Sequence, residues 1–155
     1  MALRKLTSLF IIVSGLASMS VHAAEVQGFD ISNWQSKVDF KAAYSSGARF
    51  VMIKATEGTD FIDKRFSGHY EGATDAGLIR GGYHFAHPDL SAPEQVDFFL
   101  KHGGGWSKDG ITLPGMLDLE NSKGHPTCWG ISKSEMVSWI KEVYRSSSHS
   151  SHVER

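Results

Sequence analysis

The stretch Phe50-Val51-Met52-Ile53-Lys54-Ala55 decides the fold class of this chain. A short and almost continuous apolar run of this kind is typical of a strand that is buried on both faces of a parallel sheet. We expect a helix over about residues 64–76 to follow it and to end at Gly77. A further strand is expected over residues 82–86. This strand–helix–strand order predicts parallel strands that are joined by a crossover helix.

The same alternation extends in both directions along the chain. Strands are expected over residues 26–31 and 113–119, and a helix over residues 38–46. Two further helices begin at capping boxes, and these are Ser91-Ala92-Pro93-Glu94 and Ser132-Lys133-Ser134-Glu135. Four β/α units predict an α/β fold, which is either an open doubly wound sheet or part of a β/α barrel. No glycine-rich phosphate loop follows the first strand, which disfavours a nucleotide-binding fold.

The two ends of the chain differ from this pattern. Residues 1–23 are typical of a signal peptide, because Arg4 and Lys5 precede an apolar stretch too short to span a bilayer. A membrane anchor is the weaker alternative. Residues 146–155 are rich in serine and histidine without apolar periodicity, which predicts a disordered tail. The catalytic domain is therefore expected over residues 24–145. We expect a secreted, extracellular protein.

The charge of the chain argues against two classes of partner. The full sequence has 16 Lys and Arg residues and 17 Asp and Glu residues. Loss of Arg4 and Lys5 with the leader would leave a net charge of about −3. We therefore expect no nucleic-acid partner, and no membrane partner once the leader is removed.

Acidic and histidine side chains follow each expected strand. They are Asp30, Glu57, His84 with His87, and Asp118 with Glu120. In parallel α/β folds, ligands bind at the carboxyl ends of the strands. Any one of these residues alone could be a helix cap or a solvated loop residue. Their coincidence at one rim of the sheet favours a functional site.

The sequence Met116-Leu117-Asp118-Leu119-Glu120 is the sharpest local signal. Residues two apart on a strand face the same way, so the two carboxyl groups share one side with their Cβ atoms about 6.5 Å apart. Cleavage of a glycosidic bond requires such a pair, because one group must hold a proton for the leaving oxygen. The negative charge of its neighbour raises the pKa of that group. The pair predicts a sugar-cleaving enzyme.

Several other residues allow two interpretations. His84 and His87 suggest a metal ligand pair, but a spacing of three places them on opposite faces of a strand, so we expect no metal. Trp34 and Trp129 follow the first and fourth strands, where each could stack on a sugar or anchor its loop. The single cysteine, Cys128, indicates a free thiol, a partner in another chain or a missing partner.

Four motifs in this order resemble the family 25 glycoside hydrolases, the Chalaropsis-type lysozymes or N,O-diacetylmuramidases. They are Gly28-Phe29-Asp30-Ile31-Ser32-Asn33-Trp34-Gln35, Phe50 to Gly58 followed by Phe61 and Asp63, Gly82-Tyr83-His84-Phe85, and Met116 to Glu120. The resemblance implies a modified TIM-like β/α barrel. It also implies cleavage, without a cofactor, of the β-1,4 bond between N-acetylmuramic acid and N-acetylglucosamine in bacterial peptidoglycan.

The resemblance also implies roles for individual residues. Glu120 is similar to the general acid of the family, and Asp118 would assist it or stabilise charge near the 2-acetamido group. Asp30 would lie on the floor of the same site. The substrate-binding positions implied in this way are Tyr83, Glu57 and Lys54, to which we add Trp34. Whether the reaction retains, inverts or uses substrate assistance stays open.

The resemblance ends in the helix after the fourth strand, so we expect only about the first four β/α units of the barrel. Fungal members pair a cysteine near Cys128 with a later one, and a lost partner would explain the single cysteine. We expect a monomeric, truncated enzyme with weak activity or none. Two alternatives stay open, namely a non-catalytic wall-binding remnant and a metal-dependent polysaccharide deacetylase that uses His84.

Overall fold

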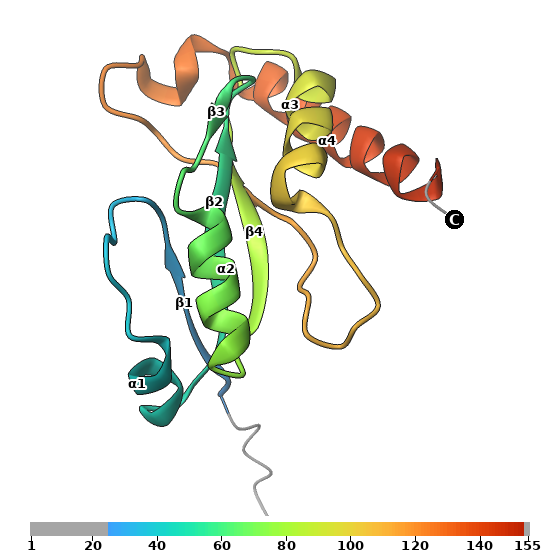
Figure 1. Ribbon diagram of the computed structural model, residues 1–155. Helices are drawn as coiled ribbons and strands as arrows, with labels where there is room; N and C mark the ends of the chain where they lie inside the picture. The colour runs from blue at the N-terminus through green and yellow to red at the C-terminus, as the bar shows by residue number, and fades with distance from the viewer. Residues whose placement is uncertain (1–24, 154–155) are drawn as a thin grey trace, which may run out of the picture.

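The computed structural model describes residues 25–153, and the side chains of residues 25–148 (Figure 1). The predicted signal peptide lies outside these residues. The strands are β1 (Gln27–Ile31), β2 (Ala48–Glu57), β3 (Phe61–Ile62), β4 (Ile79–Phe85) and β5 (Met116–Asp118). The α-helices are α1 (Phe40–Ser45), α2 (Phe66–Asp75), α3 (Ala92–Phe99) and α4 (Lys133–Val153). Two short irregular turns of helix cover Leu100–Gly104 and Thr127–Gly130.

The sheet is a curled parallel sheet with the strand order β1-β2-β4-β5. The short strand β3 adds an antiparallel pair at the end of β2. Because these strands run parallel, their carboxyl ends all lie at one edge of the sheet, the upper edge in Figure 1. Each crossover moves to the next strand in the same direction. The described strands therefore contain no reversal of order of the kind that a doubly wound sheet has.

Helices cover one face of this sheet. Ala73 of α2 and Phe40 of α1 pack with Ile31, Val51 and Ile53 in one core cluster. A second cluster joins the carboxyl end of β4 to α3 and α4, which lie side by side in Figure 1. Its buried members are Ala86, Ala92 and Trp139. The alternation of apolar residues on β2 thus builds the core on the helical side of the sheet.

The predicted helix boundaries are confirmed where the sequence has a capping signal. Gly77 has φ +81° after α2, a conformation that glycine adopts without strain. The Ser91 side chain accepts from the N–H of Glu94 at the start of α3. At α4, the amide of Ser132 donates to Glu135 at 2.7 Å, and the amide of Glu135 donates back to Ser132 Oγ at 3.3 Å.

The structure differs from the sequence prediction in three places. The hairpin strand β3 was not predicted, and β5 is shorter than the predicted strand over residues 113–119. The prediction of a disordered tail over residues 146–155 is wrong for residues 146–153, which are helical. Ser147 and Ser148 donate their hydroxyl groups to the carbonyl of Tyr144, so these serines fit within a helix. None of the helices within residues 25–153 combines the length and apolar character needed to cross a membrane.

A β-bulge in β2 redirects the side chains at its carboxyl end. Lys54 pairs with Tyr83 and Thr56 pairs with His84, so Ala55 is an extra residue on β2. Residues three apart on a regular strand point to opposite faces. Here Lys54 and Glu57 are joined by an ion pair across the same spacing. The bulge therefore places both side chains on the face opposite the helices.

Candidate active site

The carboxyl ends of the parallel strands place the predicted site residues along one rim. Asp30 lies at the end of β1, Glu57 ends β2, and Asp118 ends β5 with Glu120 two residues beyond it. Tyr83 lies two residues before the end of β4, opposite Met116 on β5. The rim therefore joins three carboxyl groups to a buried phenol. We call Asp30, Tyr83, Asp118 and Glu120 the acidic rim.

The half-buried Asp118 is the electrostatic centre of the acidic rim. Burial raises the pKa of its carboxyl group, and the negative charges of Glu120 and Asp30 raise it further. The positive charge of Lys54 partly opposes this shift. The mutual repulsion of these carboxyl groups favours a state in which one of them holds a proton, as acid–base chemistry at a sugar linkage requires.

This raised pKa predicts that Asp118→Asn stabilises the fold at neutral pH. A folded-state pKa above the unfolded value stabilises the fold below the unfolded pKa, and that gain is lost as the pH rises through the folded pKa. At pH 7 the ionised Asp118 therefore opposes folding. Because the group is partly exposed, we expect a gain of at most about 1 kcal/mol, or about 3 °C in Tm.

Thermal melts at pH 7 and at about pH 3 would check this expectation. The gain should disappear at the lower pH, where Asp118 is protonated in both states. The exposed Asp60→Asn variant is the matched control, and we expect its Tm to be unchanged. A lower Tm for Asp118→Asn at pH 7 would contradict the proposed repulsion.

Tyr83 provides an uncharged hydroxyl group in this acidic setting. Its side chain is buried, and burial raises the pKa of its phenol. The nearby carboxylates of Asp118, Asp30 and Asp63 raise this pKa further. The phenol therefore stays protonated at neutral pH and can donate a hydrogen bond to a substrate or a carboxylate.

Lys54, Glu57 and His87 form a second group beside the acidic rim. Glu57 accepts from Lys54 Nζ at 2.5 Å and from His87 Nε2 at 3.0 Å. Burial opposes the ionisation of Glu57, but the bonds from Lys54 and His87 outweigh it and lower the pKa of this carboxyl group. Glu57 thus stays ionised and is poorly suited to donate a proton, which favours the predicted role in shaping the site.

His84 faces the helices and takes no part in the rim. Its side chain is 1% exposed, with Nδ1 2.8 Å from Thr56 Oγ1 and Nε2 3.0 Å from Gln95 Oε1. Gln95 Oε1 also accepts from the amide of His87, so His84 Nε2 is the donor in its bond to Gln95. Burial lowers the pKa of His84, so its ring is neutral. Within the described part of the chain, no group of three or more potential metal ligands is present.

The structure distinguishes the two tryptophans that follow strands. Trp34 is 84% exposed and is free to contact a ligand, whereas Trp129 is 4% exposed. Trp129 is therefore a loop anchor rather than a surface for sugar stacking. The sequence allowed both interpretations for both residues, because an anchor and a sugar-binding tryptophan follow strands equally well.

Asp63 has a structural function that its place in the sequence motif did not reveal. It is 2% exposed and accepts hydrogen bonds from the amides of Asn33 at 2.7 Å and Arg65 at 2.8 Å. It therefore ties the loop after β1 to the start of α2. These two bonds fix the loop after β1, which carries Trp34.

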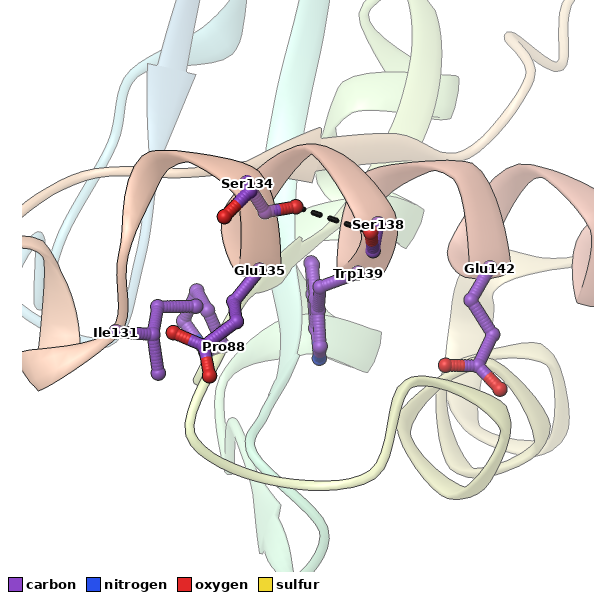
Figure 2. Close-up of a pocket in the computed structure, with 7 residues that line it drawn as sticks. All are labelled: Pro88, Ile131, Ser134, Glu135, Ser138, Trp139 and Glu142. Atoms are coloured by element: carbon purple, nitrogen blue, oxygen red, sulfur yellow. Dashed lines mark hydrogen bonds between the residues drawn. The ribbon is translucent and has the colours of Figure 1, made fainter.

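A groove of about 360 Å³ lies on another part of the surface (Figure 2). Its lining residues are Pro88, Ile131, Ser134, Glu135, Ser138, Trp139 and Glu142. Most of them belong to α4, and none belongs to the acidic rim. We assign the candidate site to the rim, because its carboxyl groups follow several different strands, whereas both acids of the groove belong to the single helix α4.

Paired carboxyl groups at the carboxyl ends of parallel strands, with a neutral phenol beside them, are typical of the class of glycoside hydrolases. A sequence profile of the glycosyl hydrolases family 25 matches residues 29–153. The chain belongs to this family, as the resemblance of its motifs predicted.

Individual relatives agree with this assignment. The N,O-diacetylmuramidase of Arthroderma benhamiae is 62% identical over 125 residues, which are 81% of this chain and 53% of the relative. The N,O-diacetylmuramidase of Chalaropsis sp is 61% identical over 120 residues, which are 75% of this chain and 57% of the relative. The chain thus spans about half the length of these relatives.

Solved structures share the fold as well as the sequence. A family 25 lysozyme from Aspergillus fumigatus superposes with a TM-score of 0.78 at 58% identity, covering 81% of this chain and 60% of that chain. A muramidase from Trichobolus zukalii has a TM-score of 0.76 at 58% identity, covering 79% and 59%. The described fold is therefore similar to part of the fold in these proteins.

Proposed function

We propose that this chain contributes the catalytic rim of a secreted muramidase that cleaves the β-1,4 bond between N-acetylmuramic acid and N-acetylglucosamine in bacterial peptidoglycan. The convergence of Asp30, Tyr83, Asp118 and Glu120 is the observation that carries this proposal. Membership of family 25 supports it. The strand order also suits a β/α barrel, in which successive parallel strands are neighbours.

In the proposed reaction, Glu120 donates a proton to the oxygen of the leaving sugar. As the bond to that oxygen breaks, positive charge develops at the anomeric carbon, and the carboxylates of Asp118 and Asp30 stabilise it. Water completes the reaction, because its oxygen forms the hydroxyl group of the new reducing end and its released proton restores Glu120. The neutral hydroxyl of Tyr83 can donate to a substrate oxygen or to a carboxylate of the rim. Lys54 and Glu57 fix the neighbouring wall of the site through their ion pair.

Digestion of bacterial cell walls tests this function directly. We expect the wild-type chain to lower the turbidity of a wall suspension at a low rate, in keeping with the weak activity expected from the sequence, and to release fragments whose new reducing ends are N-acetylmuramic acid. New reducing ends of N-acetylglucosamine would contradict the proposed bond. A chelator should leave the rate unchanged, whereas a metal-dependent deacetylase would lose activity and would release acetate.

The exposure of Trp34 predicts a role in binding rather than in bond cleavage. Stacking of an indole on a sugar contributes about 1 kcal/mol, so Trp34→Ala should raise KM about fivefold with little change in kcat or Tm. Trp106→Ala is the matched control, because Trp106 is 60% exposed but lies in the loop before β5, at the opposite edge of the sheet. Equal effects of the two substitutions would argue against a role for Trp34.

A further inference from the structure

The turn Thr127–Gly130, which we call the anchoring turn, is bonded to the segment that follows β5. Trp129 Nε1 donates to the main-chain carbonyl of Glu120 at 2.8 Å. The amide of Cys128 donates to Asn121 Oδ1, also at 2.8 Å. Two consecutive residues that follow β5, Glu120 and Asn121, are therefore bonded to two consecutive residues of the anchoring turn. Glu120 lies outside the strand, so these bonds take the place of the sheet in holding its backbone.

The indole of Trp129 packs against two imidazole rings whose centroids lie 5.5 Å apart, so the three rings form a cluster. Its ring centroid lies 4.3 Å from that of His87 and 4.2 Å from that of His125. His87 is fixed in turn, because the Gln95 side chain accepts from its amide at 2.9 Å and donates to its carbonyl at 2.8 Å. Buried Gln95 is 1% exposed, so this support extends into the core. The His87 side of the indole is thus anchored to the core, whereas His125 belongs to an exposed loop.

The backbone of the anchoring turn is strained where it presents the indole. Cys128 has φ 53° and Trp129 has φ 59°, and these are the only non-glycine residues with positive φ within the described chain. Side chains disfavour this conformation, which persists only where the surrounding contacts impose it. Strain of this kind is concentrated near functional sites. Here it places the indole N–H against the carbonyl of Glu120.

We propose that Trp129 is a positioning residue that fixes Glu120 beside Asp118 through its bond to the Glu120 carbonyl. This inference rests on the proposed function, in which Glu120 is the proton donor. A side chain whose backbone is fixed at one point samples fewer positions, and small displacements of a catalytic group reduce the rate strongly. The anchoring turn therefore acts on catalysis without contacting the substrate.

Trp139 offers a matched control for the indole bond. Its side chain is 7% exposed, and its Nε1 donates to the carbonyl of Leu90 at 2.7 Å. It belongs to α4 and lines the groove of Figure 2, and its bond holds the segment after β4 rather than the segment after β5 that carries Glu120. Trp129→Phe and Trp139→Phe each remove one buried indole N–H from one carbonyl partner. Both variants lose a bond of the same kind, so a difference in their catalytic rates shows that the bond to the Glu120 carbonyl has an effect that the bond to the Leu90 carbonyl does not have.

Two measurements on the whole chain test the proposal. In steady-state kinetics on cell walls, Trp129→Phe should lower kcat about tenfold with KM changed less than about twofold, whereas Trp139→Phe should leave both unchanged. In a titration of the Asp118 carboxyl by NMR, Trp129→Phe should lower its pKa, because a loosened Glu120 repels the Asp118 carboxylate less. Trp139→Phe should leave that pKa unchanged.

The two measurements separate this proposal from the proposed function. If wild type does not cleave cell walls, the proposed function fails, and the Asp118 titration alone then decides on Trp129. Equal pKa values in wild type, Trp129→Phe and Trp139→Phe would overturn the positioning role. If Trp129→Phe does not fold, Asn121→Ala replaces it, because Asn121 is exposed and provides the second bond to the anchoring turn. A wild-type Asp118 pKa in Asn121→Ala would equally overturn the proposal.

Discussion

Glu120→Gln is expected to lower kcat/KM on cell walls by a factor of about 10² to 10⁴ while leaving Tm nearly unchanged. Glutamine keeps the shape of the side chain but cannot donate an acidic proton to the leaving oxygen. Because Glu120 is exposed and lies just after β5, its replacement disturbs no packing in the core. Initial rates of turbidity loss, together with thermal melts of both proteins, give the two quantities.

A second substrate can show whether the lower rate of Glu120→Gln is caused by loss of the proton that Glu120 donates. An aryl glycoside whose leaving group needs no protonation should be cleaved by Glu120→Gln at a rate closer to that of wild type. Glu71→Gln, an exposed substitution on α2, is the charge-matched control and should match wild type on both substrates. A larger loss with Asp118→Asn, together with rescue of that variant by the aryl substrate, would assign the proton donor to Asp118 instead.

Gln95→Ala is expected to destabilise the fold by about 3 kcal/mol. Gln95 Oε1 accepts from both His84 Nε2 and the amide of His87, and its amide group donates to the carbonyl of His87. Alanine would leave these groups without hydrogen-bond partners in a buried site. Each unpaired buried group lowers the free energy of unfolding by about 1 to 3 kcal/mol. Urea unfolding followed by circular dichroism measures the change in the free energy of unfolding.

Gln35→Ala is the control for loss of an amide side chain. Gln35 is exposed, and its Oε1 accepts a single bond, at 2.9 Å, from the amide of Ser32. We expect its replacement to change the free energy of unfolding by about 0.5 kcal/mol or less. If Gln95→Ala were as mild as Gln35→Ala, the network around His84 would contribute little to stability.

The sequence predicted the parts of the fold that depend on local signals. The apolar run in β2 identified a buried parallel strand, and the capping residues Ser91 and Ser132 marked the starts of α3 and α4. The order of strands along the chain also predicted that the acids would meet at one rim. These inferences succeed because periodicity, helix capping and strand direction are properties of short segments.

The remaining features depend on contacts between distant segments. The extra residue Ala55 in β2 shows no local signal, because the bulge is defined only by the pairing of β2 with β4. For Trp129 the sequence allows either a sugar-binding residue or a loop anchor, and its burial follows from its packing on His87, 42 positions earlier in the chain. The helical course of residues 146–153 overrides a composition that is typical of disorder.

The bulge at Ala55 divides β2 into two parts, in which side chains alternate between the two faces of the sheet in opposite order. Before it, every second side chain of β2 contributes to the core, as Val51 and Ile53 do. After it, the phase is inverted, so Glu57 points to the same side as Lys54. Deletion of Ala55 would restore a regular strand and turn either the core residues or Glu57 to the wrong face. Ala55, which has no proposed catalytic role, thus allows one strand of ten residues to supply the core on one face and Glu57 to the site on the other.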